Sequence, residues 1–240
     1  MLKKTTFYII CLLFVISVLF FYIYKTMPKV IIDGNIDKKL ASHILSLDLS
    51  SKTISIDSGG GEAVAAATIS NHLLDFDTKI IVSGTCISAC SEFIMPSSTN
   101  IIFQNNPIIG FHWSPILDYE QYKIRNDNVL HCKFPSRDQQ LKLYKRNNLN
   151  PHFWKEIENR LDLQYYELVP KTGQCPWKRR KFRNHIWLPT SEQLRDLWKL
   201  KFRGSVCADY FERCKKQIDR RLEKGTRIVI GDVTYVSKGP

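Results

Sequence analysis

The chain has 240 residues, of which 44% are hydrophobic and 24% charged, and its formal net charge is +12. This size and composition are those of a folded chain with one or two domains, and they exclude a disordered or low-complexity protein. The basic excess would attract anionic lipid, polysaccharide or nucleic acid without selecting among them. No nucleic-acid-binding motif accompanies the densest basic cluster, Lys178–Arg183, so we interpret it as a solvated face and expect no specific nucleic-acid partner.

The N-terminus carries an uncharged apolar segment of eighteen residues, Phe7 to Tyr24. That length is about the minimum for a helix that spans a bilayer core. The segment ends in aromatic rather than small residues, which favours an uncleaved anchor over a signal peptide. Lys3 and Lys4 favour a cytoplasmic N-terminus, although the lysines from Lys25 onward weaken that bias. We therefore expect a single-pass membrane protein whose soluble domain faces the periplasm or the cell exterior.

The first half of the soluble part alternates short apolar strands with helices. The apolar patterns predict strands at 30–34, 53–57, 79–83, 101–103 and 107–111, and helices at 36–49, 62–76 and 88–95. Strands and helices that alternate at this spacing predict right-handed βαβ units and a mainly parallel sheet, hence an α/β fold.

The pattern changes after residue 118. Helices are predicted at 137–147, 152–163, 191–202 and 208–224, a basic loop at 170–183, and a terminal strand or hairpin at 226–236. We therefore divide the chain into an anchor (1–27), an α/β domain (28–204) and a C-terminal extension of a helix and a strand (205–240).

The first motif with chemical potential is the run Ser58-Gly59-Gly60-Gly61, at a predicted strand-to-helix junction. Consecutive glycines let the backbone approach a ligand closely and direct amide N–H groups into a cleft. At the start of a helix such amides can stabilise an oxyanion. Glycine-rich turns between strands and helices are nevertheless common, so this run alone does not identify a site.

The second motif is the stretch from Cys86 to Cys90, at the next strand-to-helix junction, with Ser88 and Ala89 inside it. A serine at a helix start is usually a cap, but the same position would aim a nucleophilic hydroxyl at the cleft beside the Ala89 amide. Cys90 is a competing nucleophile, although buried packing or a disulfide to Cys86 explains it more simply.

The third motif is Gly110-Phe111-His112, where a strand ends 24 residues after Ser88. A lone histidine is more often structural than catalytic, but a nucleophilic serine needs a base within hydrogen-bond reach. Parallel strands bring their carboxyl ends to one edge of a sheet, where sites gather. We therefore expect all three motifs to lie at one edge.

These motifs, read as DSGGGEAVAAATI, GTCISACSEFIMPSS and PIIGFH, resemble the Clp protease proteolytic subunit and crotonase superfamily, and most of all its periplasmic Clp-like proteins. The resemblance runs from Val30 to Pro115. It implies a Clp/crotonase-like fold and a serine peptidase site that needs no cofactor. By the same resemblance Ser88 is the nucleophile and His112 the general base, while Gly60 and Gly61 fall on the glycine motif. The oxyanion hole would then comprise Gly60, Gly61 and Ala89, with the Gly61 and Ala89 amides as its donors.

The sequence departs from the family in one respect. Family proteases carry an acidic residue that orients the histidine, and this sequence has no carboxylate at the corresponding position. Asp162 or Asp118 could replace it, or Asn184 could orient the ring. The leading hypothesis is thus a membrane-anchored serine hydrolase, specifically a peptidase that acts on peptides or proteins. The alternative is a non-catalytic Clp-fold binding or scaffold protein of the cell envelope. Family members assemble into rings or trimers, so a homo-oligomer is an open expectation.

The cysteines are the last sequence feature. Six lie outside the apolar segment, an even number that suits an oxidising compartment. Cys86 and Cys90 have no second pair at zinc-like spacing, so we expect no metal site. Cys207 and Cys214 are seven positions apart and fall on one helical side, and a regular helix would hold them too far apart to bridge. We therefore expect these two to pair elsewhere or to stay reduced.

Overall fold

The computed structural model describes residues 29–76, 78–112, 135–161, 164–165, 180–181 and 185–239. Several predicted features lie outside these ranges: the anchor at 7–24, most of the cluster Lys178–Arg183, and all three candidate orienting residues, Asp118, Asp162 and Asn184. Within the ranges, no helix has the length and apolar character needed to cross a membrane.

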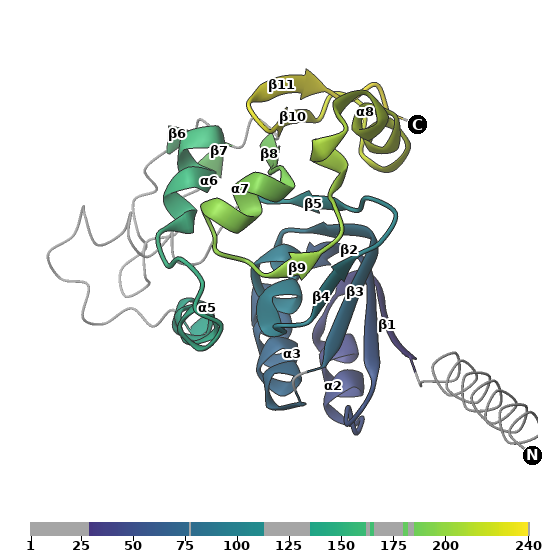
Figure 1. The fold of residues 1–240 in the computed structure, drawn as a ribbon, viewed down its shortest axis with the longest axis vertical. Coiled ribbons are helices and arrows are strands. Elements are labelled where there is room, and N and C mark those ends of the chain that lie inside the picture. Colours follow the sequence, from purple (N-terminus) through teal and green to yellow (C-terminus); the bar gives the residue numbers. More distant parts are fainter. Residues whose placement is uncertain are drawn as a thin grey trace, which may run out of the picture.

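The main sheet is parallel throughout, which confirms the predicted α/β fold with a mainly parallel sheet (Figure 1). Its order is β1 (Lys29–Ile36), β2 (Thr53–Gly61), β3 (Lys79–Ile87), β4 (Ile101–Phe103) and β9 (Phe202–Arg203). The first part of β3 pairs with β4, and its last part, from Thr85 to Ile87, pairs with β5 (Ile108–Gly110). The end of β3 thus lies between the ends of β2 and β5.

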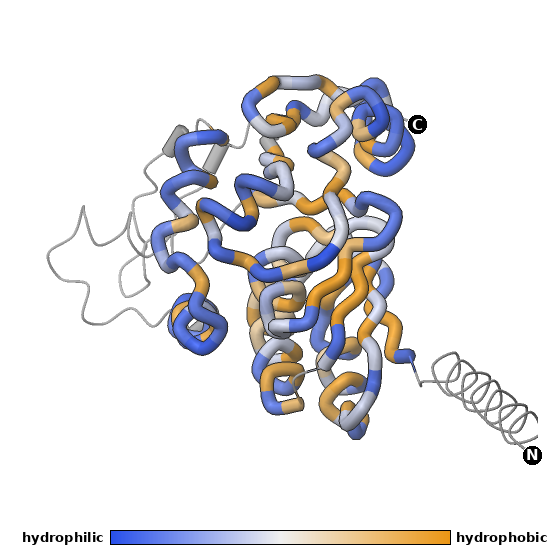
Figure 2. The backbone as a smooth tube through the Cα atoms, viewed as in Figure 1, coloured by the Kyte–Doolittle hydropathy of each residue, from blue (hydrophilic) through white to orange (hydrophobic). Residues whose placement is uncertain are grey.

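Two helices cover the sheet beside each other, α2 (Lys38–Leu45) and α3 (Ala63–Phe76) (Figure 1). The N-cap of α2 is Asp37, whose carboxylate accepts the Leu40 N–H at 2.8 Å. The buried face of α3 combines small alanines, such as Ala65 and Ala66, with the larger Ile69, Leu73 and Leu74. Figure 2 shows the resulting apolar interior, with hydrophobic residues concentrated along the central strands.

The glycine run belongs to β2 rather than to a loop, a difference from the sequence prediction, which ended this strand at residue 57. Gly60 and Gly61 pair with Asn35 and Ile36 of β1, after an irregularity in the register. Both glycines have positive φ angles, +105° and +152°. A side chain is strained at the first of these angles and rarely found at the second, so glycine is what allows this distorted end of the strand.

The second half of the domain is mainly helical. Its elements are α5 (Pro135–Arg146), α6 (Phe153–Leu161), β6 (Gln164–Tyr165), β7 (Arg180–Lys181), β8 (His185–Leu188) and α7 (Ser191–Asp196). A capping box between Thr190 and Gln193 starts α7. The prediction of one helix from 191 to 202 was wrong, because Lys199 adopts a left-handed φ of +64° and Phe202–Arg203 then pairs with β4 as β9.

The C-terminal extension contains the 3-10 turn η4 (Cys207–Asp209), α8 (Phe211–Arg221), β10 (Arg227–Ile230) and β11 (Val233–Val236). The predicted terminal hairpin is present, and β10 also pairs with β8 to make a three-stranded sheet. Asp219 of α8 holds the hairpin by accepting hydrogen bonds from the Tyr235 hydroxyl and the Lys238 N–H.

The expectation that Cys207 and Cys214 cannot bridge was wrong. They form a disulfide with a Cα–Cα distance of 4.9 Å. Seven positions along one regular helix would separate them by about 10.5 Å. Here Cys207 lies in the 3-10 turn, and Tyr210, with φ of −129° and ψ of 74°, breaks the chain before α8 begins. The break folds Cys207 back toward Cys214.

A buried aromatic cluster joins the two halves of the domain. Phe111 continues from β5 and forms a backbone bridge with Trp187 of β8, through N–H to carbonyl hydrogen bonds of 2.9 and 2.8 Å. Phe111 also packs edge-on against Phe153 and Trp198, and these two rings stack with centroids 4.8 Å apart. This cluster fixes the backbone next to His112.

Candidate active site

Ser88 is the residue at which β3 turns into the short π-helix η1 (Cys90–Ile94). Its φ is +59°, a left-handed conformation that is uncommon for serine. Its N–H donates to the Gly110 carbonyl at 3.0 Å, and its carbonyl accepts the Glu92 N–H at 2.9 Å. The Ser88 side chain does not cap η1, and its hydroxyl makes no hydrogen bond to any described residue. The backbone is thus fully engaged while the hydroxyl remains available.

A disulfide joins Cys86 to Cys90 across this turn, with Cα atoms 5.2 Å apart. It is one of the two explanations that the sequence offered for Cys90. Because a disulfide sulfur cannot act as a thiolate nucleophile, the bond removes Cys90 as a competitor of Ser88.

Gly60 and Ala89 lie next to Ser88. A Cβ placed on Gly60 would be 2.7 Å from the Ser88 Cβ and 3.2 Å from the Ala89 nitrogen. The Ala89 N–H makes no hydrogen bond to any described residue, so it is available as a donor. The Gly60 N–H is engaged, since it donates to Ser58 Oγ at 3.1 Å.

Gly61 lies on the other side of β2. A Cβ there would be 2.1 Å from the Ile36 carbonyl oxygen of β1. The neighbouring Glu62 N–H donates to that same oxygen at 2.8 Å. Of the three predicted oxyanion residues, the structure therefore brings Gly60 and Ala89 to Ser88, and it packs Gly61 against β1.

His112 follows β5 at the same edge of the sheet as Ser88, two residues after Gly110, whose carbonyl accepts the Ser88 N–H. It is half-buried and directly follows Phe111, which is fixed to β8. The three motifs thus meet where the sequence predicted, because β5 pairs with the last residues of β3. No hydrogen bond joins the Ser88 hydroxyl to the His112 ring in this structure. Such bonds are often long before substrate binds.

Ser91 is a residue of this edge that the sequence reasoning missed. Its side chain is fully buried, and its Oγ lies 2.9 Å from the Ser88 carbonyl oxygen and 2.7 Å from that of Gly110. Its single proton can be donated to only one carbonyl at a time. Ser91 thereby ties the turn that carries Ser88 to the strand that leads to His112.

A second missed group connects the C-terminal extension to the glycine run. The Asp57 carboxylate accepts the Thr85 N–H at 2.7 Å and the Arg221 guanidinium at 2.7 and 3.0 Å. Arg221 also donates to the Thr85 hydroxyl at 2.9 Å. A Cβ on Gly84 would overlap the Asp57 carboxylate at 2.1 Å, so glycine makes room for it. The contact anchors the end of α8 one residue before Ser58.

Glu92 is a third missed residue, and it is completely buried four positions after Ser88. Its Oε2 accepts a hydrogen bond from Gln140 and lies 3.4 Å from the Tyr144 hydroxyl, both on α5. Its Oε1 has no hydrogen-bond partner in the described part of the chain. Burial raises the Glu92 pKa to about 8, against the smaller lowering effect of the two hydrogen bonds. The side chain is thus mostly a neutral acid at pH 7.

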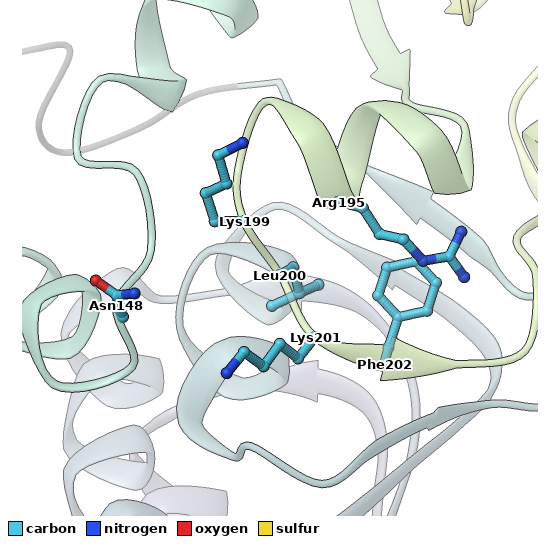
Figure 3. A pocket seen from close by; sticks show the side chains of 6 residues that line it. All are labelled: Asn148, Arg195, Lys199, Leu200, Lys201 and Phe202. Carbon is cyan, nitrogen blue, oxygen red and sulfur yellow. The ribbon is translucent and has the colours of Figure 1, made fainter.

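An open cavity of about 480 Å³ lies elsewhere, between the end of α5 and the segment after α7. Asn148, Arg195, Lys199, Leu200, Lys201 and Phe202 line it. Figure 3 shows that the cations do not converge, because the Arg195 side chain lies beside the Phe202 ring while the two lysines extend in other directions. None of the three motifs lines this cavity. Among the described residues, moreover, no cluster of histidine, cysteine and acidic side chains could hold a metal ion.

Comparison with known proteins gives likenesses of structure only. No protein family model matches the sequence, and no curated protein sequence matches it. The chain is similar in structure to the catalytic domain of the ClpP protease from Plasmodium falciparum, at a TM-score of 0.41 and 15% identity over 78% of this chain and 88% of that one. It is also similar to a ClpP1 mutant from Listeria monocytogenes, at a TM-score of 0.41 and 15% identity over 73% and 90% of the two chains.

Proposed function

We propose that this chain is a serine hydrolase, specifically a peptidase, with Ser88 as nucleophile and His112 as general base. The observation that carries the proposal is the state of Ser88. Its backbone adopts a left-handed turn held by hydrogen bonds on both sides, while its hydroxyl bonds to no described residue. A serine that only capped a helix would donate or accept locally with that hydroxyl, and Ser88 does not.

In the proposed reaction His112 takes the hydroxyl proton as Ser88 Oγ attacks the carbonyl carbon of a peptide, which forms a tetrahedral oxyanion and then an acyl-enzyme. The free Ala89 N–H is the first donor to the oxyanion. The second donor comes from the Gly60–Gly61 segment. Gly60 lies beside Ser88 and Ala89, and its N–H would have to exchange Ser58 Oγ for the oxyanion.

The remaining parts of the proposal rest on the sequence. Asp162 or Asn184 is proposed to orient the His112 ring, and the apolar segment Phe7–Tyr24 to anchor the chain with its α/β domain outside the cytoplasm. Assembly into a homo-oligomer is proposed from the resemblance to Clp subunits. Peptides or proteins of the cell envelope would then be the substrates.

The test is covalent labelling of the full-length chain, in mild detergent, with a fluorophosphonate probe. We expect labelling of the wild type and a loss of it in Ser88→Ala and in His112→Ala. The control is Ser42→Ala, which removes an exposed hydroxyl on α2. Absence of labelling in a wild-type chain with intact near-ultraviolet circular dichroism would reject the proposal.

The alternative is a non-catalytic binding or scaffold protein of the cell envelope. One observation favours it: the Ser88 hydroxyl is not hydrogen-bonded to His112 in this structure. On this alternative, both Ser88→Ala and His112→Ala leave every property of the chain unchanged except local stability. The same labelling experiment therefore decides between the two functions.

A further inference from the structure

The disulfide between Cys86 and Cys90 encloses the candidate nucleophile. Cys86 is the penultimate residue of β3 and Cys90 the first residue of η1, so the covalent bond closes a five-residue loop with Ser88 at its centre. Both cysteines are fully buried. The ring therefore fixes the end of the strand to the start of the helix around Ser88, whose backbone is left-handed.

That backbone conformation needs support. A non-glycine residue at a φ of +59° is less stable than the same residue in the right-handed region, because its Cβ crowds the carbonyl oxygen. Relaxation of Ser88 into the right-handed region would let η1 begin earlier and would swing the hydroxyl away from the Ala89 amide. Hydrogen bonds to Gly110 and Ser91 oppose this relaxation, and the disulfide limits it covalently.

We propose that the Cys86–Cys90 disulfide is a positioning device that makes the reactivity of Ser88 depend on the oxidation state of this cysteine pair. The inference rests on the proposed serine hydrolase function. The disulfide form holds Ser88 in its reactive conformation, and the dithiol form does not. Reduction by a dithiol breaks the S–S bond and gives two cysteine thiols, while the reductant gives up two electrons and two protons and closes to its own disulfide. Because both sulfurs are buried, the loop must open before a reductant reaches them.

The chain offers a matched control. The second disulfide, Cys207–Cys214, joins η4 to α8 and encloses none of the predicted site residues. Removing it takes away one disulfide, as removal of Cys86–Cys90 does, but leaves the loop that holds Ser88 unchanged. If both disulfides only stabilise the fold, removal of either one should change the reactivity of Ser88 to the same extent.

The experiment compares fluorophosphonate labelling of three full-length chains in mild detergent: wild type, Cys86→Ala/Cys90→Ala and Cys207→Ala/Cys214→Ala. Varying the probe concentration separates its binding constant KI from the maximal inactivation rate kinact. We expect kinact to fall about tenfold or more in the first variant, with KI unchanged, which corresponds to the energy of a strained backbone residue. We expect the second variant to keep the wild-type kinact.

A second measurement serves if the first variant does not fold. Ser88 and both cysteines lie on one short peptide, so mass spectrometry of dithiothreitol-treated wild-type chain reports probe adduct and disulfide state on the same fragment. We expect the adduct on peptides whose Cys86–Cys90 bond was intact and not on reduced ones. Equal labelling of both forms, or an unchanged kinact in the folded variant, overturns this inference alone. Absence of any adduct on the oxidised wild type overturns the proposed function and the inference with it.

Discussion

Glu92 makes the stability of this protein depend on pH in a direction that can be worked out. Its carboxyl group is buried with a pKa raised from 4.5 to about 8. The unfolded chain therefore loses this proton at lower pH than the folded chain does. Between about pH 4.5 and pH 8 the folded state binds more protons, so the free energy of unfolding falls as pH rises through this window. Below the window the contribution of the neutral acid is fully present.

The magnitude follows from the two pKa values. The difference between the folded and unfolded pKa of Glu92 corresponds to a loss of unfolding free energy on the order of 5 kcal/mol once the pH exceeds both values. About 4 kcal/mol of this loss falls between pH 5 and pH 8.5. The total stability of a domain is about 5–15 kcal/mol, so a loss of this size would be a large part of it. The Tyr144 hydroxyl beside Glu92 has a pKa raised well above 10, by burial first and then by the Glu92 charge, so it stays neutral in this range.

The perturbation is Glu92→Gln, which keeps the shape of the side chain and removes its titration. Urea denaturation of wild type and variant at several pH values from 5 to 8.5 measures the difference in unfolding free energy. The glutamine amide group replaces an oxygen, Oε1, that has no partner among the described residues. Because this amide does not titrate, its effect on the difference in unfolding free energy is the same at every pH. We expect the unfolding free energy of the variant, relative to that of the wild type, to increase by about 4 kcal/mol as pH rises from 5 to 8.5.

The control is Glu192→Gln, which changes an exposed carboxylate on α7. The wild type and this variant should show parallel pH profiles. A stability difference between wild type and Glu92→Gln that varies by less than about 1 kcal/mol over the same range would refute the reasoning, because it would mean that the buried carboxyl does not hold its proton in the folded state.

Three further predictions concern the site and its supports. Gly60→Ala should lower fluorophosphonate labelling about a hundredfold, because its Cβ would displace the nucleophile's own Cβ, whereas Gly59→Ala, with nothing within 4 Å of the new Cβ, should label like the wild type. Phe111→Ala should cost about 3–5 kcal/mol of unfolding free energy in urea, since the ring is fully buried among other aromatic rings; a cost under about 1 kcal/mol would contradict the packing seen here. A double-mutant cycle of Asp57→Asn and Arg221→Gln should give a coupling of about 0.5–1 kcal/mol that weakens with added salt, as expected for a pair more than a third exposed; a salt-independent coupling would argue against an ion pair.

Several features of the fold could be predicted from local sequence patterns. Short apolar runs separated by amphipathic stretches predicted the parallel sheet, because strands joined by helices of this length run in one direction. The carboxyl ends of those strands then had to lie at one edge, which predicts from the sequence alone that the segments of Gly60, Ser88 and His112 lie together. Each of these inferences uses only residues that are neighbours along the chain.

Tertiary structure alone decided the details of the site. The motif predicted Gly61 as an oxyanion donor, and in the folded chain Gly61 packs against Ile36 of β1 while Gly60 lies beside Ser88. The disulfide between Cys207 and Cys214 depended on a break at Tyr210 that helical periodicity does not reveal.

Two contacts at the site had no local signature at all, because their partners are far apart in sequence. Asp57 meets Arg221 across 164 positions, and Glu92 meets Gln140 across 48. Whether a polar side chain is buried, paired or free depends on such distant partners. The sequence by itself therefore predicted which residues could carry chemistry, and it determined at which edge of the sheet their segments gather. The packing of distant segments decided which glycine lies beside Ser88, which cysteines pair and which carboxyl is buried, because these properties depend on contacts that form only when the whole chain is folded.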